Sequence, residues 1–161
     1  METREFRQED AEAVSKIMQA AFKTFLRDKW GKEDERHFSP EAITRSSFRP
    51  ADFVKTAAFV AVDGRTILGY ICGTAGDNGL GSLEVVGVDP ESFHKGVGKA
   101  LLSRLEQFWR DNKQRKVRTC VSAHNTRGLV YYVSNGFIPV GYRKDHFRAG
   151  VDEIDLDRFL G

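Results

Sequence analysis

The chain has 161 residues, of which 40% are hydrophobic and 30% charged, and its 25 basic and 23 acidic side chains give a net charge of +2. This length fits one domain, and the near-neutral balance disfavours a general nucleic-acid or membrane-surface binder. No apolar run reaches the length of a membrane span, and the first residues lack the apolar core of a secretory signal. Cys72 and Cys120 lie within apolar runs, which indicates buried, reduced thiols in a cytoplasmic protein.

The first part of the chain is predicted to be mainly helical. Apolar residues recur at helical spacing over 9–27, and acidic residues in the first turn favour a helix N-terminus there. Residues 28–40 are polar and predict a loop or a short broken helix. A second, weaker helix is predicted over 40–48.

The remaining elements alternate between strands and helices. Strands are predicted at 57–62 and 66–73, joined by an Asp63-Gly64 turn, and at 82–88, before Asp89-Pro90. Next come a helix over 98–112, a strand over 117–123, a helix over 126–135 and a closing pair of strands at 137–147 and 151–159. This order predicts a mixed α/β fold built on one sheet.

The loop between strand 82–88 and helix 98–112 contains Gly96, and Gly98 and Lys99 follow at the start of the helix. Its free backbone N–H groups and the positive end of the helix dipole would make an anion site suited to phosphate. A plain strand-to-helix turn that needs small residues is the alternative. Ala100 after Lys99 excludes a Walker loop, and Leu101 stands where a dinucleotide fingerprint needs its third glycine.

Two motifs resemble those of the GNAT superfamily of acyl-CoA-dependent N-acyltransferases. The first is Val88-Asp89-Pro90 followed by Lys95-Gly96-Val97-Gly98-Lys99-Ala100-Leu101-Leu102. The second runs from Asn125 to Phe137 and is similar to Asn-x-x-Ala-x-x-Leu-Tyr-x-x-x-Gly-Phe, with Gly128 for Ala and Tyr131 for Leu. Phe93 departs from the family's Gln or Arg, which weakens the first match without breaking it.

The resemblance implies a fold, a domain and a cofactor. The fold is α/β, a mixed, mostly antiparallel central sheet flanked by helices, and residues 1–161 form a single GNAT domain. Acetyl-CoA is the implied co-substrate, and no metal is expected. The implied cofactor-binding residues lie on the third strand, in the glycine loop and before the last helix: Val86, Gly87, Val88, His94, Lys95, Gly96, Val97, Gly98, Lys99 and Asn125. Asn125 could instead serve only as a helix N-cap.

Two residues are the predicted catalytic groups. The family motif aligns Tyr132 with the general acid that protonates the CoA sulfur, although Tyr132 could instead pack beside the cofactor. Glu84 is the candidate base, and strand alternation predicts that it shares a face with Val86 and Val88. The alternative is that Glu84 stands at an exposed strand start and pairs with a surface cation.

The implied reaction is direct transfer of an acetyl group from acetyl-CoA to a primary amine of a small molecule. The acceptor is expected between segments 28–55 and 143–152. An apolar wall could be formed there by Trp30, Phe38, Phe48 and Phe53, although core packing explains these aromatic residues equally well. Neither nucleic acid nor membrane is expected as a partner, and a homodimer would be ordinary for the family. The alternatives are a catalytically silent CoA-binding sensor, a protein N-terminal acetyltransferase, and a nucleotide- or nucleic-acid-binding α/β domain. Enzymes that acetylate protein N-termini carry a glutamate where this chain has Cys120.

Overall fold

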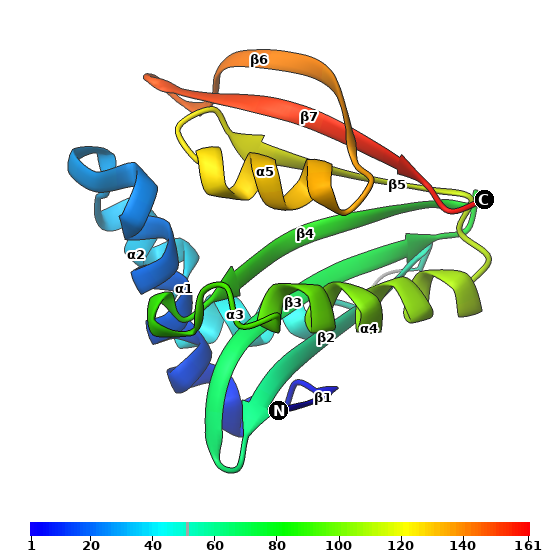
Figure 1. Ribbon diagram of the computed structural model, residues 1–161, viewed down its shortest axis with the longest axis horizontal. Helices are drawn as coiled ribbons and strands as arrows, with labels where there is room; N and C mark the ends of the chain where they lie inside the picture. The colour runs from blue at the N-terminus through cyan, green and yellow to red at the C-terminus, as the bar shows by residue number, and fades with distance from the viewer. Residues whose placement is uncertain (51) are drawn as a thin grey trace.

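The computed structural model describes residues 1–50 and 52–161; Ala51, in the segment predicted to flank the acceptor, lies outside them. A seven-stranded sheet has the order β1-β2-β3-β4-β5-β7-β6 (Figure 1). The strands are β1 (Glu2–Glu5), β2 (Val54–Asp63), β3 (Thr66–Gly76), β4 (Leu80–Val88), β5 (Lys116–Ser122), β6 (Ile138–Arg148) and β7 (Val151–Phe159). All neighbouring strands pair antiparallel except β4 and β5, which are parallel.

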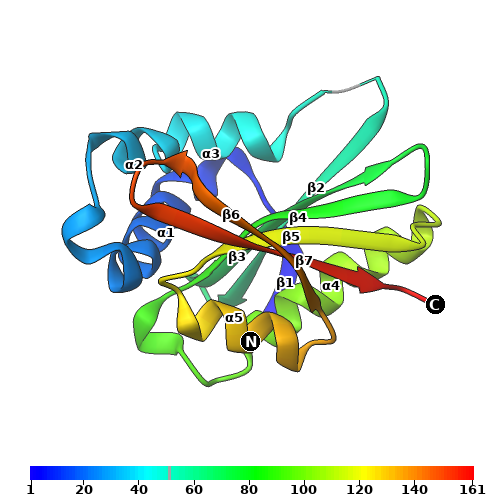
Figure 2. The same cartoon turned by 90° about the horizontal axis from the view of Figure 1, so that it is seen from above.

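Helices cover both faces of the sheet. The helices are α1 (Ala11–Leu26), α2 (Lys32–His37), α3 (Pro40–Ser47), α4 (Val97–Asp111) and α5 (Thr126–Ser134). Figure 2 shows α1, α2 and α3 on one side of the sheet and α4 and α5 on the other. We call the two sides the α1 face and the α4 face. None of the described helices has the length and apolarity that crossing a membrane requires.

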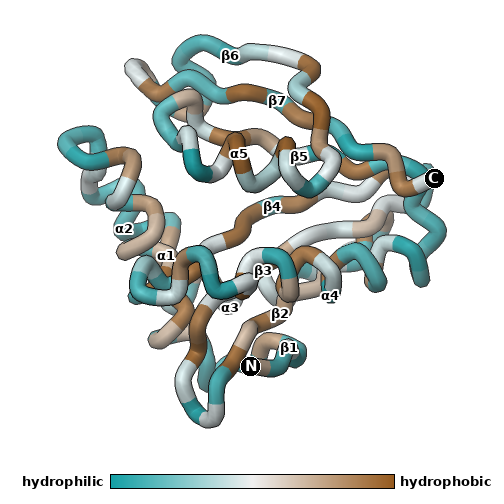
Figure 3. Tube along the Cα trace, viewed as in Figure 1, coloured by the Kyte–Doolittle hydropathy of each residue, from teal (hydrophilic) through white to brown (hydrophobic). Residues whose placement is uncertain are grey.

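Each face of the sheet has its own hydrophobic core. On the α4 face, Leu101, Leu105 and Trp109 of α4 are completely buried against the strands, as their helical spacing predicts. On the α1 face, Val14 and Met18 of α1 are completely buried. Figure 3 shows hydrophobic residues concentrated along the central strands and hydrophilic residues around α2. The core therefore fixes the central strands, and α2 belongs to the periphery.

The sequence predicted nearly all of these elements with ends within three residues. The segment 28–40 is a 3-10 turn (Arg27–Lys29) followed by the short helix α2, which fits the expected broken helix. Strand β1 was not predicted from the sequence, because its four residues are mostly charged and show no apolar alternation. β1 is nevertheless stable as an edge strand, since it pairs with β2 and its Arg4 forms an ion pair with Asp10 at 2.8 Å.

Candidate active site

Strands β4 and β5 are neighbours that separate along most of their length. In the described part of the chain they pair only over Leu80–Ser82 and Lys116–Arg118, and they then diverge (Figure 1). The separation opens a cleft of about 1030 Å³ that contains residues from both faces of the sheet, including Phe22 from the α1 face and Tyr132 from the α4 face. A ligand in this cleft can therefore contact both layers of helices.

The predicted phosphate loop lies at one end of the cleft. His94 and Gly96 have positive φ values of 63° and 79°, a conformation that suits glycine and is unusual for histidine. The first hydrogen bond of α4 runs from the Ala100 N–H to the Gly96 carbonyl at 3.0 Å. The amides of residues 97–99 therefore point out of the helix end, as an anion site requires.

The structure brings nearly all predicted cofactor residues to this cleft. Those that line it are Val86, Gly87, Val88, His94, Gly96, Val97, Gly98, Lys99 and Asn125. Lys95 is exposed and is not part of the cleft lining. Packing also requires glycine at position 87, because a Cβ there would clash with the Met18 sulfur. Contact of these residues with a cofactor stays a prediction.

Helix α5 contacts the predicted phosphate loop and the start of α4 through a hydrogen bond and a cation–π contact. The Tyr131 hydroxyl donates to the Gly98 carbonyl at 2.8 Å, and the Arg127 guanidinium lies 4.1 Å from the centre of the Phe93 ring. Phe93 stands where the family has Gln or Arg. The contact holds a cation from α5 next to the position at which the loop has lost its own polar side chain.

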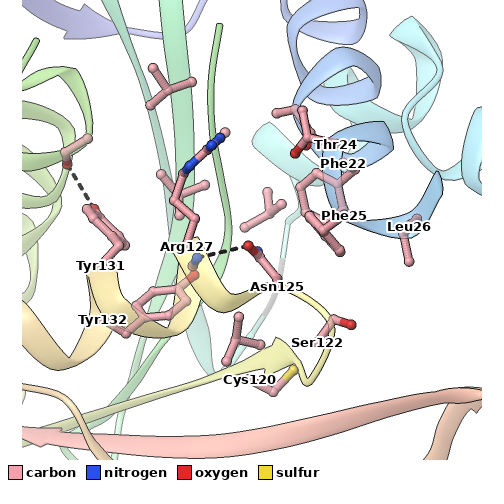
Figure 4. Close-up of a pocket in the computed structure, with 18 of the residues that line it drawn as sticks. Phe22, Thr24, Phe25, Leu26, Cys120, Ser122, Asn125, Arg127, Tyr131 and Tyr132 are labelled. Carbon is pink, nitrogen blue, oxygen red and sulfur yellow. Dashed lines mark hydrogen bonds between the residues drawn. The ribbon is translucent and has the colours of Figure 1, made fainter. Parts of the chain in front are cut away.

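Asn125 caps helix α5. Its side-chain oxygen accepts a hydrogen bond from the Gly128 N–H at 2.8 Å (Figure 4). This geometry matches the N-cap interpretation of the sequence. Asn125 also lines the cleft, so its predicted contact with the pantetheine arm stays a prediction.

Tyr132 is buried in the α4-face core and lines the cleft. Burial raises the pKa of its phenol far above the usual value, and the neighbouring Thr119 hydroxyl opposes that shift only in part. The phenol is therefore fully protonated at neutral pH. A buried thiolate forming beside it would also be costly, so proton donation can accompany the breaking of a C–S bond.

A β-bulge changes the orientation of Glu84. The pairing of β3 with β4 shifts between Cys72/Val85 and Gly73/Leu83, so Glu84 is the extra residue. The expectation that Glu84 shares a face with Val86 and Val88 is wrong. Those valines pack in the α4-face core, whereas the Glu84 side chain lies toward Arg49, which follows α3 in the sequence. The physical reason is that a bulge interrupts the alternation on which the expectation rested.

Glu84 nevertheless lines the cleft and has two polar partners. Its carboxylate accepts a hydrogen bond from Ser82 and lies 4.0 Å from the Arg49 guanidinium, with the side chain 38% exposed. The contact with Arg49 matches the alternative interpretation, a partly exposed carboxylate paired with a cation. The role of Glu84 as the base stays a prediction.

A second carboxylate in the cleft, that of Glu153 on β7, was not predicted from the sequence. Only 6% of Glu153 is exposed, and it lies opposite Ser122 of β5 in the strand register. Burial, reinforced by the nearby negative charge of Asp155, raises the pKa of Glu153 to about 7. The available signal was its alternation with Ile154 and Leu156, which assigns it to the other side of β7.

The far end of the cleft has an apolar wall. Phe22 and Phe25 of α1 lie on one side, with Cys120 and Ser122 of β5 opposite (Figure 4). Arg148, at the end of β6, connects the predicted flanking segments: it forms an ion pair with Asp34 at 2.7 Å and donates to the Lys29 carbonyl at 2.7 Å. Segments 28–55 and 143–152 therefore meet at this end, as the sequence analysis expected.

The composition of this wall differs from the prediction. Of the four aromatic residues expected there, only Phe38 lines the cleft. The Trp30 ring stacks on the Phe38 ring, with 6.2 Å between the ring centres. Phe48 and Phe53 are 53% and 73% exposed and lie outside the lining. Their place is taken by Phe22, Phe25 and Phe147, because the end of α1 and the β6–β7 hairpin approach the cleft more closely than the segment after α3.

Comparisons with known proteins agree with this geometry. The sequence profile of the acetyltransferase (GNAT) family matches residues 14–137. N-alpha-acetyltransferase RimI of Mycobacterium tuberculosis (strain ATCC 25618 / H37Rv) is 33% identical over 109 residues, which are 63% of this chain and 65% of that protein. The chain thus spans about two thirds of the length of this curated relative.

Two solved structures share the fold at low sequence identity. PaiA N-acetyltransferase from Thermoplasma acidophilum, in complex with coenzyme A, superimposes with a TM-score of 0.76 at 22% identity over 98% of both chains. The ribosomal-protein-S18-alanine N-acetyltransferase from Escherichia coli gives a TM-score of 0.74 at 17% identity, over 99% of this chain and 93% of that chain. The predicted fold and family are confirmed: the chain belongs to the GNAT acetyltransferase family.

Proposed function

We propose that this chain transfers an acetyl group directly from acetyl-CoA to the primary amine of a small molecule. The observation that carries the proposal is the separation of β4 from β5. The resulting cleft runs from the amides at the start of α4 past Tyr132 to buried and half-exposed carboxylates. Anion binding, proton donation and proton acceptance are thus available along one path.

Each part of the cleft has a role in the proposed reaction. The loop at His94–Lys99 binds the pyrophosphate, and the unpaired edge of β4 at Val86 and Val88 holds the pantetheine arm. The amine attacks the thioester carbonyl, a C–N bond forms, and the C–S bond then breaks. Tyr132 donates its proton to the leaving sulfur and regains one from the nitrogen, while a carboxylate of the cleft accepts the proton of the incoming ammonium.

The bridge formed by Arg148 supports a small acceptor. It connects β6 to α2 across the end of the cleft that lies away from the loop, and an extended polypeptide would need this end open.

One GNAT domain over residues 1–161 and a cytoplasmic location belong to the proposal. Similarity to RimI favours a second candidate, acetylation of protein N-termini. A CoA-binding sensor is the third.

Calorimetry and a turnover assay test the proposal. We expect acetyl-CoA to bind, and ATP and NAD not to bind; absence of acetyl-CoA binding contradicts all three candidates. Release of the CoA thiol is then compared between a panel of small amines and peptides with free N-termini. Faster turnover of a small amine supports the proposal, preference for a peptide supports the second candidate, and binding without turnover supports the sensor.

A further inference from the structure

We propose that Glu153 is the carboxylate that receives the acceptor's ammonium group, and that the acceptor is a primary amine carried on an apolar body. This inference rests on the proposed function and deepens it. It assigns the base to β7 instead of β4 and gives the chemical class of the acceptor.

Glu153 is buried without a cation from the described residues beside its carboxylate. The register of β6 and β7 pairs it with Arg143, but the Arg143 guanidinium binds Asp155 at 2.6 Å and contacts His146 at 3.1 Å. None of the ion pairs of the described residues includes Glu153. A buried carboxylate without a cation is costly, so this position favours a ligand that brings a positive charge.

The surroundings of Glu153 are mostly acidic. Asp155 is close to Glu153 on β7, and Cys120, which pairs with Asp155, lies diagonally across from Glu153 on β5. Tyr132 of α5 is also nearby, and Glu84 lines the cleft from the separated strand β4. From the α1 face, Glu33, Asp34 and His37 line the same cleft, and Asp34 is already paired with Arg148. Burial, followed by the nearby negative charge of Asp155, raises the pKa of Glu153 to about 7. A base with this pKa is partly ionised at neutral pH and is well matched to proton transfer.

Glu84 is less suited to this task. Its carboxylate accepts a hydrogen bond from the Ser82 hydroxyl and lies near the Arg49 guanidinium, so its negative charge is already partly neutralised. It is also considerably more exposed than Glu153. A half-exposed carboxylate with these partners gains less from binding an ammonium ion than a buried one without them.

The side chains that line the acceptor end of the cleft indicate that the acceptor amine has an apolar body. The acceptor end is lined by apolar side chains from α1, from the turn before α3 and from the β6–β7 hairpin: Phe22, Phe25, Leu26, Phe38, Phe147 and Val151. An aryl or alkyl body gains free energy by leaving water against these groups. The hydroxyl groups of a sugar would lose their hydration against these side chains without enough partners in return.

The proton balance is complete with the groups present. The acceptor enters as R–NH₃⁺ and gives one proton to the Glu153 carboxylate, which later releases it to water. The free amine attacks the acetyl carbonyl, the C–N bond forms and the C–S bond breaks. The sulfur takes a proton from Tyr132, and Tyr132 regains one from the nitrogen. The products are the acetamide, CoA–SH and one released proton.

The test compares Glu153→Gln with the matched variant Glu84→Gln. The assay follows CoA release from 2-phenylethylamine, hexylamine, glucosamine and spermidine as a function of pH. We expect the apolar amines to be preferred, and their kcat/KM in the wild type to rise with pH through a value near 7. In Glu153→Gln we expect this rise to disappear and kcat/KM to fall about a hundredfold. In Glu84→Gln we expect the rise to remain.

A binding measurement separates charge recognition from turnover. Calorimetry with the CoA complex compares 2-phenylethylamine with 2-phenylethanol, which has no charge. We expect the wild type to prefer the amine and Glu153→Gln to lose that preference while retaining its affinity for acetyl-CoA. The inference is overturned if the pH dependence is lost in Glu84→Gln instead, or if spermidine or glucosamine is the better acceptor; the proposed function would survive both results. Absence of turnover with every amine and peptide would instead remove the proposed function.

Discussion

The guanidinium of Arg127, on α5, lies 4.1 Å from the ring centre of Phe93, in the loop before α4. Both residues line the cleft, so this contact joins its two sides at the mouth where the phosphates are expected. Phe93 replaces the polar side chain that the family motif has in this loop. The contact therefore brings a positive charge to that place from a different helix.

Replacing Arg127 with Ala is expected to weaken acetyl-CoA binding about tenfold, or about 1.4 kcal/mol. The reason is loss of a cation beside the phosphate loop, and calorimetry measures the change. Arg104→Ala is the matched control, because the Arg104 guanidinium also lies over a phenylalanine, 4.8 Å from the Phe59 ring centre, but outside the cleft lining. Equal affinities in the two variants would contradict the prediction.

The adjacent tyrosines of α5 are expected to fail in different ways. Tyr132→Phe should lower turnover at least about tenfold with little change in acetyl-CoA affinity, because only the proton donor is lost. Tyr131→Phe removes the hydrogen bond to Gly98, so it should weaken acetyl-CoA binding and preserve turnover at saturating cofactor. Steady-state kinetics at varied acetyl-CoA distinguish the two effects. Unchanged turnover in Tyr132→Phe would refute its role as the acid.

Glu153 should make folding stability depend on pH in a defined direction. Its pKa is raised to about 7 in the folded protein, above the ordinary value near 4.3. The folded state therefore binds more protons between these values, and stability falls as pH rises through 7. Glu153→Gln removes the effect, so its Tm relative to the wild type should increase from pH 5 to pH 8.

Asp10→Asn is the control for these melting curves. Burial favours the neutral form of Asp10, but its bonds to Arg4 and to the Arg7 amide outweigh burial and lower its pKa. Asp10 is ionised at both pH 5 and pH 8, so Asp10→Asn should lower Tm by a similar amount at each. A Tm difference for Glu153→Gln that stays constant between the two pH values would show that Glu153 titrates normally.

The bridge between β6 and α2 should affect the acceptor and not the cofactor. Arg148→Ala is expected to raise the KM of a small amine about fivefold, near 1 kcal/mol, and to leave acetyl-CoA affinity unchanged. Asp34→Asn should have a similar effect, and the double variant should be no worse than either, because both remove the same contact. Additive effects would mean that the two residues act separately.

The sequence predicted the fold well because most elements have strong periodic signals. The stripe of α4 and the alternation of the central strands follow directly from residue types. Strand β1 had no such signal, since Glu2–Glu5 is held by pairing with β2 and not by its own apolar pattern. Recognition of the loop residues depended on order along one continuous segment, and nearly all of them reach the cleft.

The acceptor end was less predictable because it is assembled from distant segments. Phe22 and Phe147 lie 125 positions apart in the sequence, and only the tertiary fold brings both to the lining of one cleft. From the sequence, Glu153 looks like one polar residue of a half-exposed strand, and only the tertiary structure shows that it is buried. Phe53 looked like a candidate by type alone, yet it faces solvent. Local patterns do not determine which polar face of a strand becomes covered.

The bulge at Glu84 is a place where β4 can lose a residue without turning its other side chains over. Leu83 pairs with Gly73 and Val85 pairs with Cys72, so removal of Glu84 would leave both pairs in register and restore regular alternation. Removal of Val86 would instead bring Val88 into the place of Gly87, opposite Tyr70, where even a Cβ would clash with the Met18 sulfur. Deletion of Val86 should therefore be far more harmful to folding than deletion of Glu84. Among relatives, we expect differences in the length of this strand to fall at this position.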